Sequence, residues 1–446
     1  MSTRLNIRDK QIFAIALPSI VSNITVPLLG LVDVTIVGHL GSAAYIGAIA
    51  VGGMLFNIMY WLFAFLRMGT SGMVSQAYGS RNLAETVRLL IRAVLIALAV
   101  SMLMICLQHP LRNLSLLFVG PTEEVGRLAT SYFDICIWGA PAVLSLYVLT
   151  GWFVGMQNSR IPMMVAVVQN IVNILASLLF VCAGNMKVEG IALGTLVAQY
   201  FGLFVAAGLW VRHYGRLRKK VSLKDINLRN KDERRAMWRF FNLNRDIFLR
   251  TLCLVAVTLF FTSAGASQGN TILAVNALLM QLFTLFSYVM DGFAAAGEAL
   301  IGKAVGADNE RLYTSSIHRL FVWGGVMTLI FTTVYAFGGT SFLGLLTNEQ
   351  SVISASSAYL PWALLIPVCG MSAFIWDGVF IGATATWQML VSMLSATAVF
   401  FTAYFALYPS IANHGLWISF LCYLATRGIV QTILYKRSLQ FALRKK

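Results

Sequence analysis

The stretch Pro27-Leu28-Leu29-Gly30-Leu31-Val32-Asp33 places a carboxylate inside the first long apolar run of the sequence, residues 11–37. A charged side chain at membrane depth costs a few kcal/mol, so an acid that is retained there generally faces a cavity or a partner and has a function. The same run contains Pro18 and Pro27, and each proline removes a backbone donor and weakens the helix locally. The first hypothesis is therefore that Asp33 is a coupling residue and that Pro18 and Pro27 form a helix hinge.

The composition indicates a polytopic membrane protein. Of 446 residues, 58% are hydrophobic and only 11% are charged, whereas soluble proteins carry about 25% charged residues. The net charge of +16 would suggest nucleic-acid binding in a soluble protein. Here we interpret it as topogenic charge and expect no nucleic-acid partner.

Twelve runs are long and apolar enough to cross a bilayer, which takes about 20 mainly apolar residues. They are residues 11–37, 44–77, 85–107, 124–155, 161–184, 189–212, 245–267, 271–302, 312–338, 352–382, 385–408 and 412–435. The predicted fold class is therefore an all-α protein with twelve transmembrane helices.

Basic residues are concentrated before the first run, between the sixth and seventh runs and at the end of the sequence. Because cytoplasmic loops carry an excess of Lys and Arg, both termini and the long central loop are predicted to be cytoplasmic. We expect a multi-pass protein of a bacterial inner membrane that contacts membrane lipids and is monomeric.

The central basic loop is the predicted boundary between two halves. The expected domains are an N-terminal six-helix lobe (1–212), a basic cytoplasmic linker (213–244) and a C-terminal six-helix lobe (245–446). Six spans precede the linker, so both halves enter the membrane from the same side. Parallel repeats of this kind favour two pseudo-symmetric bundles around a central cleft.

A direct comparison of the halves supports an internal duplication. With an ungapped offset of 227 residues, Tyr45–Asn82 aligns with Ile272–Asn309. The same offset places Gly151–Gly155 on Gly378–Gly382. Hydrophobic bias alone does not explain one offset that works in two separate places.

Several polar residues lie within the predicted spans of the first half. They are Asp33, Asn57, Arg67, Asp134, Gln169, Asn170 and Asn173. Arg67 has two interpretations: it is a structural partner for an acid or for backbone carbonyls, or it tunes the pKa of Asp33 or Asp134. The sequence leaves this choice open.

The second half carries a different set of acids. Asp291 and Glu298 are seven residues apart, about two helical turns, so both carboxylates are predicted to face the same way. Asp377 lies in the tenth run. The repeat aligns Thr150 with Asp377 and Ala64 with Asp291, so we expect two unlike acidic centres and not one symmetric site.

An enzyme is not expected. The sequence contains no G-x-x-x-x-G-K-[ST] motif and no nucleophile motif, and its histidines and cysteines show no metal-ligand spacing. We therefore expect no cofactor. The internal duplication also makes a receptor an unfavourable interpretation.

Several spaced motifs resemble the multidrug and toxic compound extrusion (MATE) family, and in particular its DinF branch within the MOP flippase superfamily. They are Leu17-Pro18, Pro27–Asp33, Gly38–Gly41, Phe65–Gly72, Asn244–Thr251, Asp291–Ala294 and Trp376-Asp377-Gly378. The likeness covers nearly the whole chain.

The resemblance implies secondary antiport, in which an inward-moving proton or sodium ion drives organic cations out. It also implies that Asp33 is the essential acid of the first helix, that Asn170 and Asn173 are polar site positions, and that Asp377 corresponds to an acid used by sodium-linked relatives. Ser177 stands where many relatives carry an acid, and Asp246 lies at the start of the seventh run. Both departures favour protons over sodium.

We therefore predict proton-coupled export of amphiphilic, cationic compounds. The alternative is sodium coupling, with sodium at Asp377 and with Asp291 or Glu298 nearby. A third interpretation is a flippase for lipid-linked oligosaccharides, which requires a cationic cavity. Arg67 as the lone deep cation among several acids argues against it.

Overall fold

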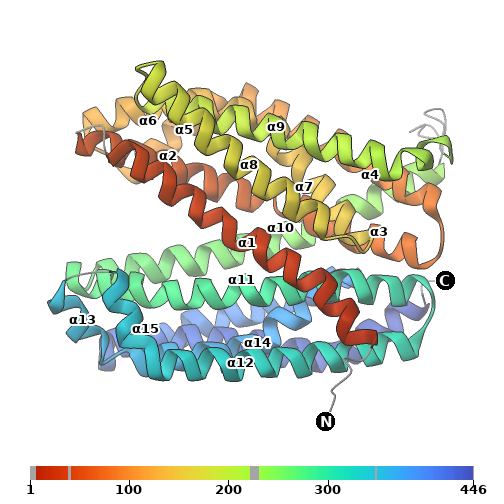
Figure 1. Ribbon diagram of the computed structural model, residues 1–446. Coiled ribbons are helices and arrows are strands. Elements are labelled where there is room, and N and C mark those ends of the chain that lie inside the picture. Colours follow the sequence, from red (N-terminus) through yellow and green to blue (C-terminus); the bar gives the residue numbers. More distant parts are fainter. Residues whose placement is uncertain (1–6, 39–41, 221–230, 347–348, 445–446) are drawn as a thin grey trace, which may run out of the picture. The chain divides into compact units, whose positions relative to one another are not determined.

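The computed structural model describes residues 7–38, 42–220, 231–346 and 349–444, and every regular element in these ranges is a helix (Figure 1). The all-α prediction is confirmed for this part of the chain. After α1 (Ile7–Gly38), the first half contains α2 (Ala43–Leu62), α3 (Phe65–Gly79), α4 (Leu83–Cys106), α5 (Gln108–Val119), α6 (Glu123–Cys136), α7 (Ala140–Gly155), α8 (Arg160–Leu178) and α9 (Val188–Tyr214). The second half contains α10 (Lys231–Ala266), α11 (Asn270–Gly306), α12 (Glu310–Leu346), α13 (Gln350–Ser356), α14 (Leu360–Gly382) and α15 (Thr386–Arg444).

The helices agree with the twelve predicted spans. Ten helical stretches in the described residues are long and apolar enough to cross a membrane. One of them, Thr386–Tyr435, contains two predicted runs, which are separated by a kink at Ala412 (φ 45°). The first predicted run lies in α1. The twelve-helix arrangement is therefore consistent with the structure.

The internal duplication is visible in the backbone. In the described ranges, the non-glycine residues with positive φ form three pairs, and the members of each pair are 227 residues apart: Arg81 and Asp308, Gln157 and Thr384, Asn185 and Ala412. Positive φ is uncommon for such residues and marks tight turns. The turns between corresponding helices are thus built in the same way in both halves.

Helix caps repeat with the same spacing. The side-chain oxygen of Asn82 accepts from the backbone N–H of Glu85 at 3.1 Å and so caps the start of α4. Asn309 accepts from the backbone N–H of Leu312 at 2.8 Å at the start of α12. Each cap satisfies a donor that the first turn of a helix leaves without an intrahelical partner.

A close helix–helix contact also recurs in each half. A Cβ atom on Gly151 of α7 would lie 2.2 Å from the backbone oxygen of Arg67 in α3. A Cβ atom on Gly378 of α14 would lie 2.2 Å from the backbone oxygen of Ala294 in α11. Only glycine fits this close to a backbone oxygen, so the aligned glycines mark a close backbone contact that recurs in each repeat.

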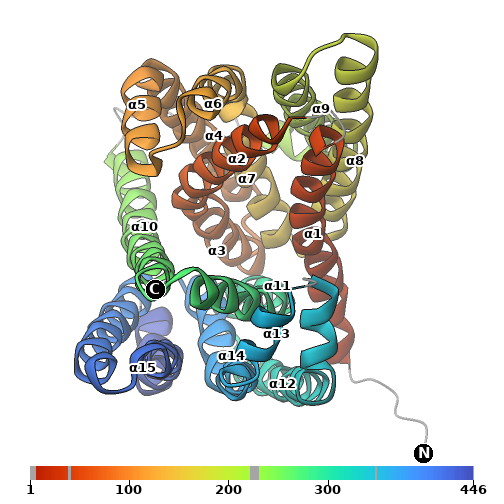
Figure 2. The same cartoon turned by 90° about the vertical axis from the view of Figure 1, so that its left-hand side faces the viewer.

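The chain forms two compact units, and their boundaries differ from the expected lobes. The first-half unit is Val21–Phe240. The second-half unit combines residues up to Ile20 with residues from Phe241 onward. The start of α1 therefore belongs with the second half, because its side chains pack on α11 and α12. Figure 2 shows this end of α1 beside α12.

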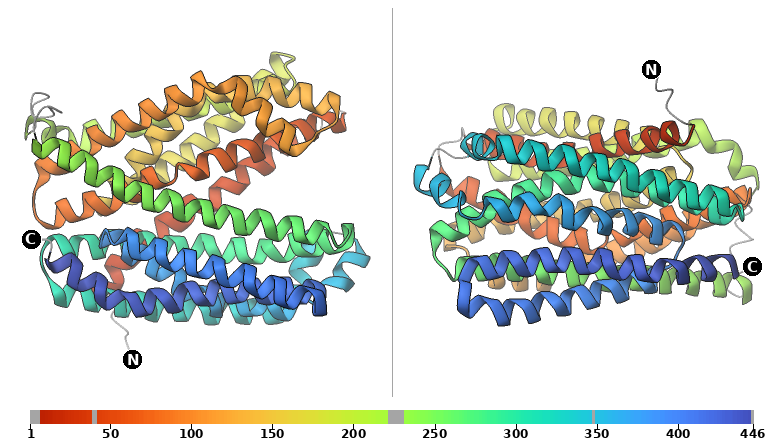
Figure 3. Two further views of the ribbon diagram at one scale, coloured as in Figure 1. Left: turned by 180° about the vertical axis from the view of Figure 1, so that it is seen from behind. Right: turned by 90° about the horizontal axis from the view of Figure 1, so that it is seen from below.

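Each unit has a central helix. In Val21–Phe240, α7 packs against α3, α4 and α9. In the second-half unit, α14 packs against α11, α12 and α15, which lie side by side in the views of Figure 3. Residues 221–230 of the expected linker 213–244 lie outside the described residues, and the linker's remaining described residues are helical.

α1 runs as one helix through both prolines. Pro18 is buried and Pro27 is exposed. Neither proline can donate to the carbonyl four residues earlier, so α1 is weakened on both sides of the boundary between Ile20 and Val21 without being broken.

Candidate functional site

Asp33 lies in the part of α1 that belongs to the first-half unit. Its side chain is buried, and its Oδ1 atom has no hydrogen-bond partner among the described residues. It is close enough to Tyr132 and Cys136 of α6 to interact with them electrostatically. A buried carboxylate with an oxygen that has no partner is costly as a free charge, so it favours binding a proton or a cation.

Polar side chains from α8 and α9 continue this site. The side-chain amide of Asn173 donates to the hydroxyl of Thr195 at 3.1 Å. Thr195 and Cys136 also lie close to Tyr132. These four residues form a polar cluster from α6, α8 and α9, and Asp33 of α1 lies near two of its members.

Several further oxygens in the same unit are buried without a hydrogen-bond partner in the described part of the chain. They are Asn173 Oδ1, Ser177 Oγ, Gln199 Oε1 and Tyr60 OH. Glycine gives two of them room: a Cβ on Gly194 would lie 2.3 Å from Ser177 Oγ, and a Cβ on Gly139 would lie 1.7 Å from Gln199 Oε1. Such oxygens can accept from a protonated acid or bind a hard cation.

Asn170 has a different role from Asn173. Its side-chain amide donates to the backbone carbonyl of Thr25 in α1 at 2.9 Å. It therefore fixes α8 to α1 eight residues before Asp33, and contributes to the site by positioning it.

Asp134, one of the two acids whose pKa Arg67 was predicted to tune, forms an ion pair with another arginine. Both Asp134 carboxylate oxygens accept from Arg112 of α5, at 2.8 and 2.7 Å, and Asp134 is 41% exposed. Its partner is therefore Arg112. Arg67 is partly buried and lies near Tyr147 of α7.

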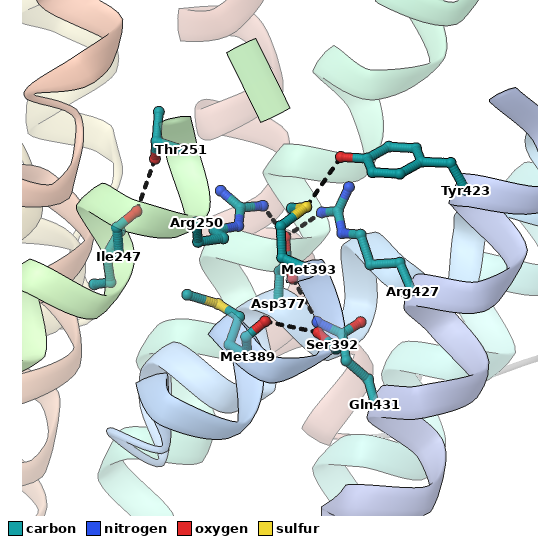
Figure 4. A network of polar contacts seen from close by, with 10 residues as sticks. All are labelled: Ile247, Arg250, Thr251, Asp377, Met389, Ser392, Met393, Tyr423, Arg427 and Gln431. Atoms are coloured by element: carbon teal, nitrogen blue, oxygen red, sulfur yellow. Dashed lines mark hydrogen bonds and ion pairs between the residues drawn. The ribbon is translucent and has the colours of Figure 1, made fainter. Parts of the chain in front are cut away.

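Asp377 forms the centre of a second polar site, in the second-half unit (Figure 4). Its Oδ2 atom accepts from Arg250 of α10 and from Arg427 of α15, and its Oδ1 atom accepts from Gln431 at 2.7 Å. All four side chains are buried. Figure 4 shows the two guanidinium groups converging on the carboxylate from different helices.

This environment does not fit the predicted sodium site at Asp377. Two guanidinium groups already bind one carboxylate oxygen, and their positive charges would repel a cation at close range. In the described residues there is also no cluster of three or more His, Cys, Asp or Glu side chains that could hold a metal ion.

The prediction that Arg67 is the lone deep cation is wrong. Arg250 and Arg427 are both buried, with Arg427 only 2% exposed. Both lie within predicted apolar runs, 245–267 and 412–435, so the criterion that singled out the acids would have found them. The argument against a flippase that rested on Arg67 alone is therefore lost.

Asp291 and Glu298 do not share an environment. Asp291 is exposed, whereas Glu298 is 1% exposed, because α11 is enclosed by its neighbours from Gly292 onward. Asp291 interacts electrostatically with Arg427 and thus lies near the Asp377 site. The spacing of two turns places both acids on the same face of α11, but this face is exposed at Asp291 and buried at Glu298.

Comparisons with known proteins support this architecture. The family model MatE matches residues 18–179 and 247–405, one segment in each half. DNA damage-inducible protein F of Escherichia coli is 38% identical over 441 residues, which cover 96% of this chain and 92% of that protein. The probable multidrug resistance protein NorM of Idiomarina loihiensis is 21% identical, covering 94% of this chain and 92% of that protein.

Solved structures show the same fold. The Vibrio cholerae MATE transporter VcmN in the bent form superposes with a TM-score of 0.83 at 17% identity, covering 97% of each chain. A MATE structure in the straight conformation gives a TM-score of 0.84 at 20% identity, covering 98% of this chain and 97% of that chain.

Proposed function

The chain belongs to the MATE family of membrane transporters, and on this premise we propose that it exports amphiphilic organic cations in exchange for inward-moving protons. It is a multi-pass membrane transporter and not an enzyme. The proposal concerns the coupling ion, the substrate class and the residues that carry them. It includes a bacterial inner-membrane location with both termini in the cytoplasm.

The observation that carries the proposal is the buried Asp33 carboxylate with an oxygen that has no partner in the described residues. As an anion, Asp33 attracts a cationic substrate, because the surrounding apolar environment strengthens the attraction between charges. As a neutral acid, it loses that attraction and gains a hydroxyl donor. The unpartnered oxygens of Asn173, Gln199 and Tyr60 are acceptors in the same unit.

Exchange follows from the chemistry of a single carboxylate. One carboxylate cannot be protonated and act as the counter-ion of an organic cation at the same time. Proton binding therefore releases substrate, and substrate binding releases the proton. This competition is the physical basis of antiport in the proposal.

Sodium is the second candidate for the coupling ion. Asp33, Asn173 Oδ1 and Ser177 Oγ are buried oxygens of one unit, and oxygen ligands suit hard cations. Asp33 is the one carboxylate among these three groups. Asp377 in the other unit is already paired with two arginines, so it is a poor ligand for sodium. We favour the proton because it needs only Asp33 itself.

Transport by purified protein in proteoliposomes tests the proposal. With ethidium as the substrate, we expect a pH gradient to drive transport and a sodium gradient at constant pH to be ineffective. Asp33→Asn should abolish gradient-driven transport while the protein remains folded. Transport at the wild-type rate by Asp33→Asn, or transport driven by sodium alone, would refute the proposal.

A further inference from the structure

The first half of α1 is attached to the second-half unit along one helix face. Asp9, Phe13, Ala16 and Ile20 follow the spacing i, i+4, i+7 and i+11, which places them on one face of a helix. Every one of these residues contacts α11 or α12. The face is therefore a continuous attachment of about three turns.

The attachment begins with a buried polar contact. The indole N–H of Trp323 in α12 donates to the Asp9 carboxylate at 3.0 Å, and Arg319 lies 3.8 Å from the other oxygen of this carboxylate. The Asp9 residue is only 5% exposed. A hydrogen bond to a charged acceptor in a buried site is stronger than one between neutral groups.

Aromatic and backbone packing extend the attachment. The Phe13 ring meets the Trp323 ring edge-on, with centroids 4.6 Å apart, and meets Phe293 of α11 at 6.1 Å. Farther along, a Cβ on Gly292 would lie 2.3 Å from Ile20 and 2.9 Å from the carbonyl oxygen of Ala16. The glycine allows α1 and α11 to approach closely.

The second half of α1 is attached elsewhere. Its Thr25 carbonyl accepts from Asn170, and its Val37 side chain belongs to the core of the first-half unit. The division at Ile20 lies between Pro18 and Pro27, where two helix hydrogen bonds are missing. One helix thus links an anchored end in one unit to the Asp33 site in the other.

We propose that Asp9, Phe13 and Trp323 are positioning residues for transport. They form an anchor through which α1 transmits a change of bound ion or substrate at Asp33 to the second-half unit. This proposal rests on the proposed function, because it requires Asp33 to change its bound ion or substrate during the cycle. The anchor residues act through α1. The substrate affinity of the resting protein does not depend on them.

The test compares coupling with binding in the full-length protein. Trp323→Phe keeps an aromatic ring beside Phe13 and removes the N–H donor together with one ring of the indole, and the control below makes the same change in ring size. We expect the pH-driven rate of ethidium transport to fall about tenfold, the factor for one lost hydrogen bond to a charged group. The Kd of ethidium for the detergent-solubilised protein should remain within a factor of two of wild type.

Trp362→Phe is a matched control. Trp362 is also partly buried, lies in the same unit and donates an indole hydrogen bond, to His414 at 2.9 Å. We expect this variant to transport at the wild-type rate. Asp9→Asn is a second variant that loses the charge and retains an acceptor for Trp323, and we expect an intermediate rate.

Two results would overturn the anchor. The first is a wild-type transport rate in Trp323→Phe. The second is a parallel loss of transport, ethidium affinity and thermal stability, which would assign Trp323 a general structural role. A wild type driven by sodium and not by protons would refute the proposed function, and the same comparison under a sodium gradient would then decide on the anchor.

Discussion

Replacing Asp377 with asparagine tests whether this acid stabilises the fold or carries the coupling ion. Asp377 is the shared acceptor of Arg250, Arg427 and Gln431, and all four side chains are buried. Asp377→Asn keeps the size of the side chain but leaves two guanidinium groups without a counter-charge on that residue. The variant should therefore be strongly destabilised.

The expected magnitude follows from the burial of the pair. Removing one partner of a buried ion pair costs about 3–5 kcal/mol. Because two arginines lose their shared counter-charge here, we expect the upper part of this range. Combining Asp377→Asn with Arg427→Met removes one of the two uncompensated charges, so the double variant should recover about 1–3 kcal/mol.

The assay is the free energy of unfolding of the detergent-purified protein, measured by denaturant titration. Asp134→Asn is the matched control, because Asp134 also pairs with an arginine but is 41% exposed. Exposed pairs contribute about 0–1 kcal/mol, so the control should be close to wild type. Transport is measured on the same preparations.

The opposite pattern would contradict a structural role for Asp377. If Asp377→Asn unfolds like wild type but loses all gradient-driven transport, Asp377 carries the coupling ion. A double variant that is less stable than Asp377→Asn would show that Arg427 stabilises the unit in another way.

Two further predictions concern helix contacts. Gly151→Ala and Gly378→Ala should each lower the free energy of unfolding by about 1–3 kcal/mol, because the added methyl group pushes α7 away from α3 and α14 away from α11. Gly53→Ala is the control and should be neutral or slightly stabilising, because no atom lies within 4 Å of the added Cβ. A neutral Gly151→Ala would contradict the close contact. Asn170→Ala should lower stability by about 1 kcal/mol through loss of the hydrogen bond to the Thr25 carbonyl, and unchanged unfolding would show that this contact contributes nothing.

The spans and the duplication could be predicted because both depend on local sequence. Runs of apolar residues mark membrane helices directly, and the offset of 227 residues also aligns turns such as Arg81 and Asp308, whose unusual backbone follows the repeat. Local breaks were harder to foresee. The run 44–77 contains a turn at Phe63 and Ala64 that separates α2 from α3, and no proline marks it.

Pairings between distant side chains could not be predicted from the sequence. Asp377 is 127 residues from Arg250 and 50 residues from Arg427, so only packing of α14 with α10 and α15 brings them together. Arg112 reaches Asp134 in the same way, from a helix outside the predicted spans. The division of α1 between two units is likewise a property of tertiary contacts.

Proton release on substrate binding tests directly whether Asp33 exchanges a proton for a cation. In a weakly buffered solution, adding tetraphenylphosphonium to the detergent-solubilised protein should release protons from wild type. Asp33→Asn, which has no proton to exchange at that position, should release none. Proton release of equal size from both proteins would contradict the exchange of a proton for a cation at Asp33.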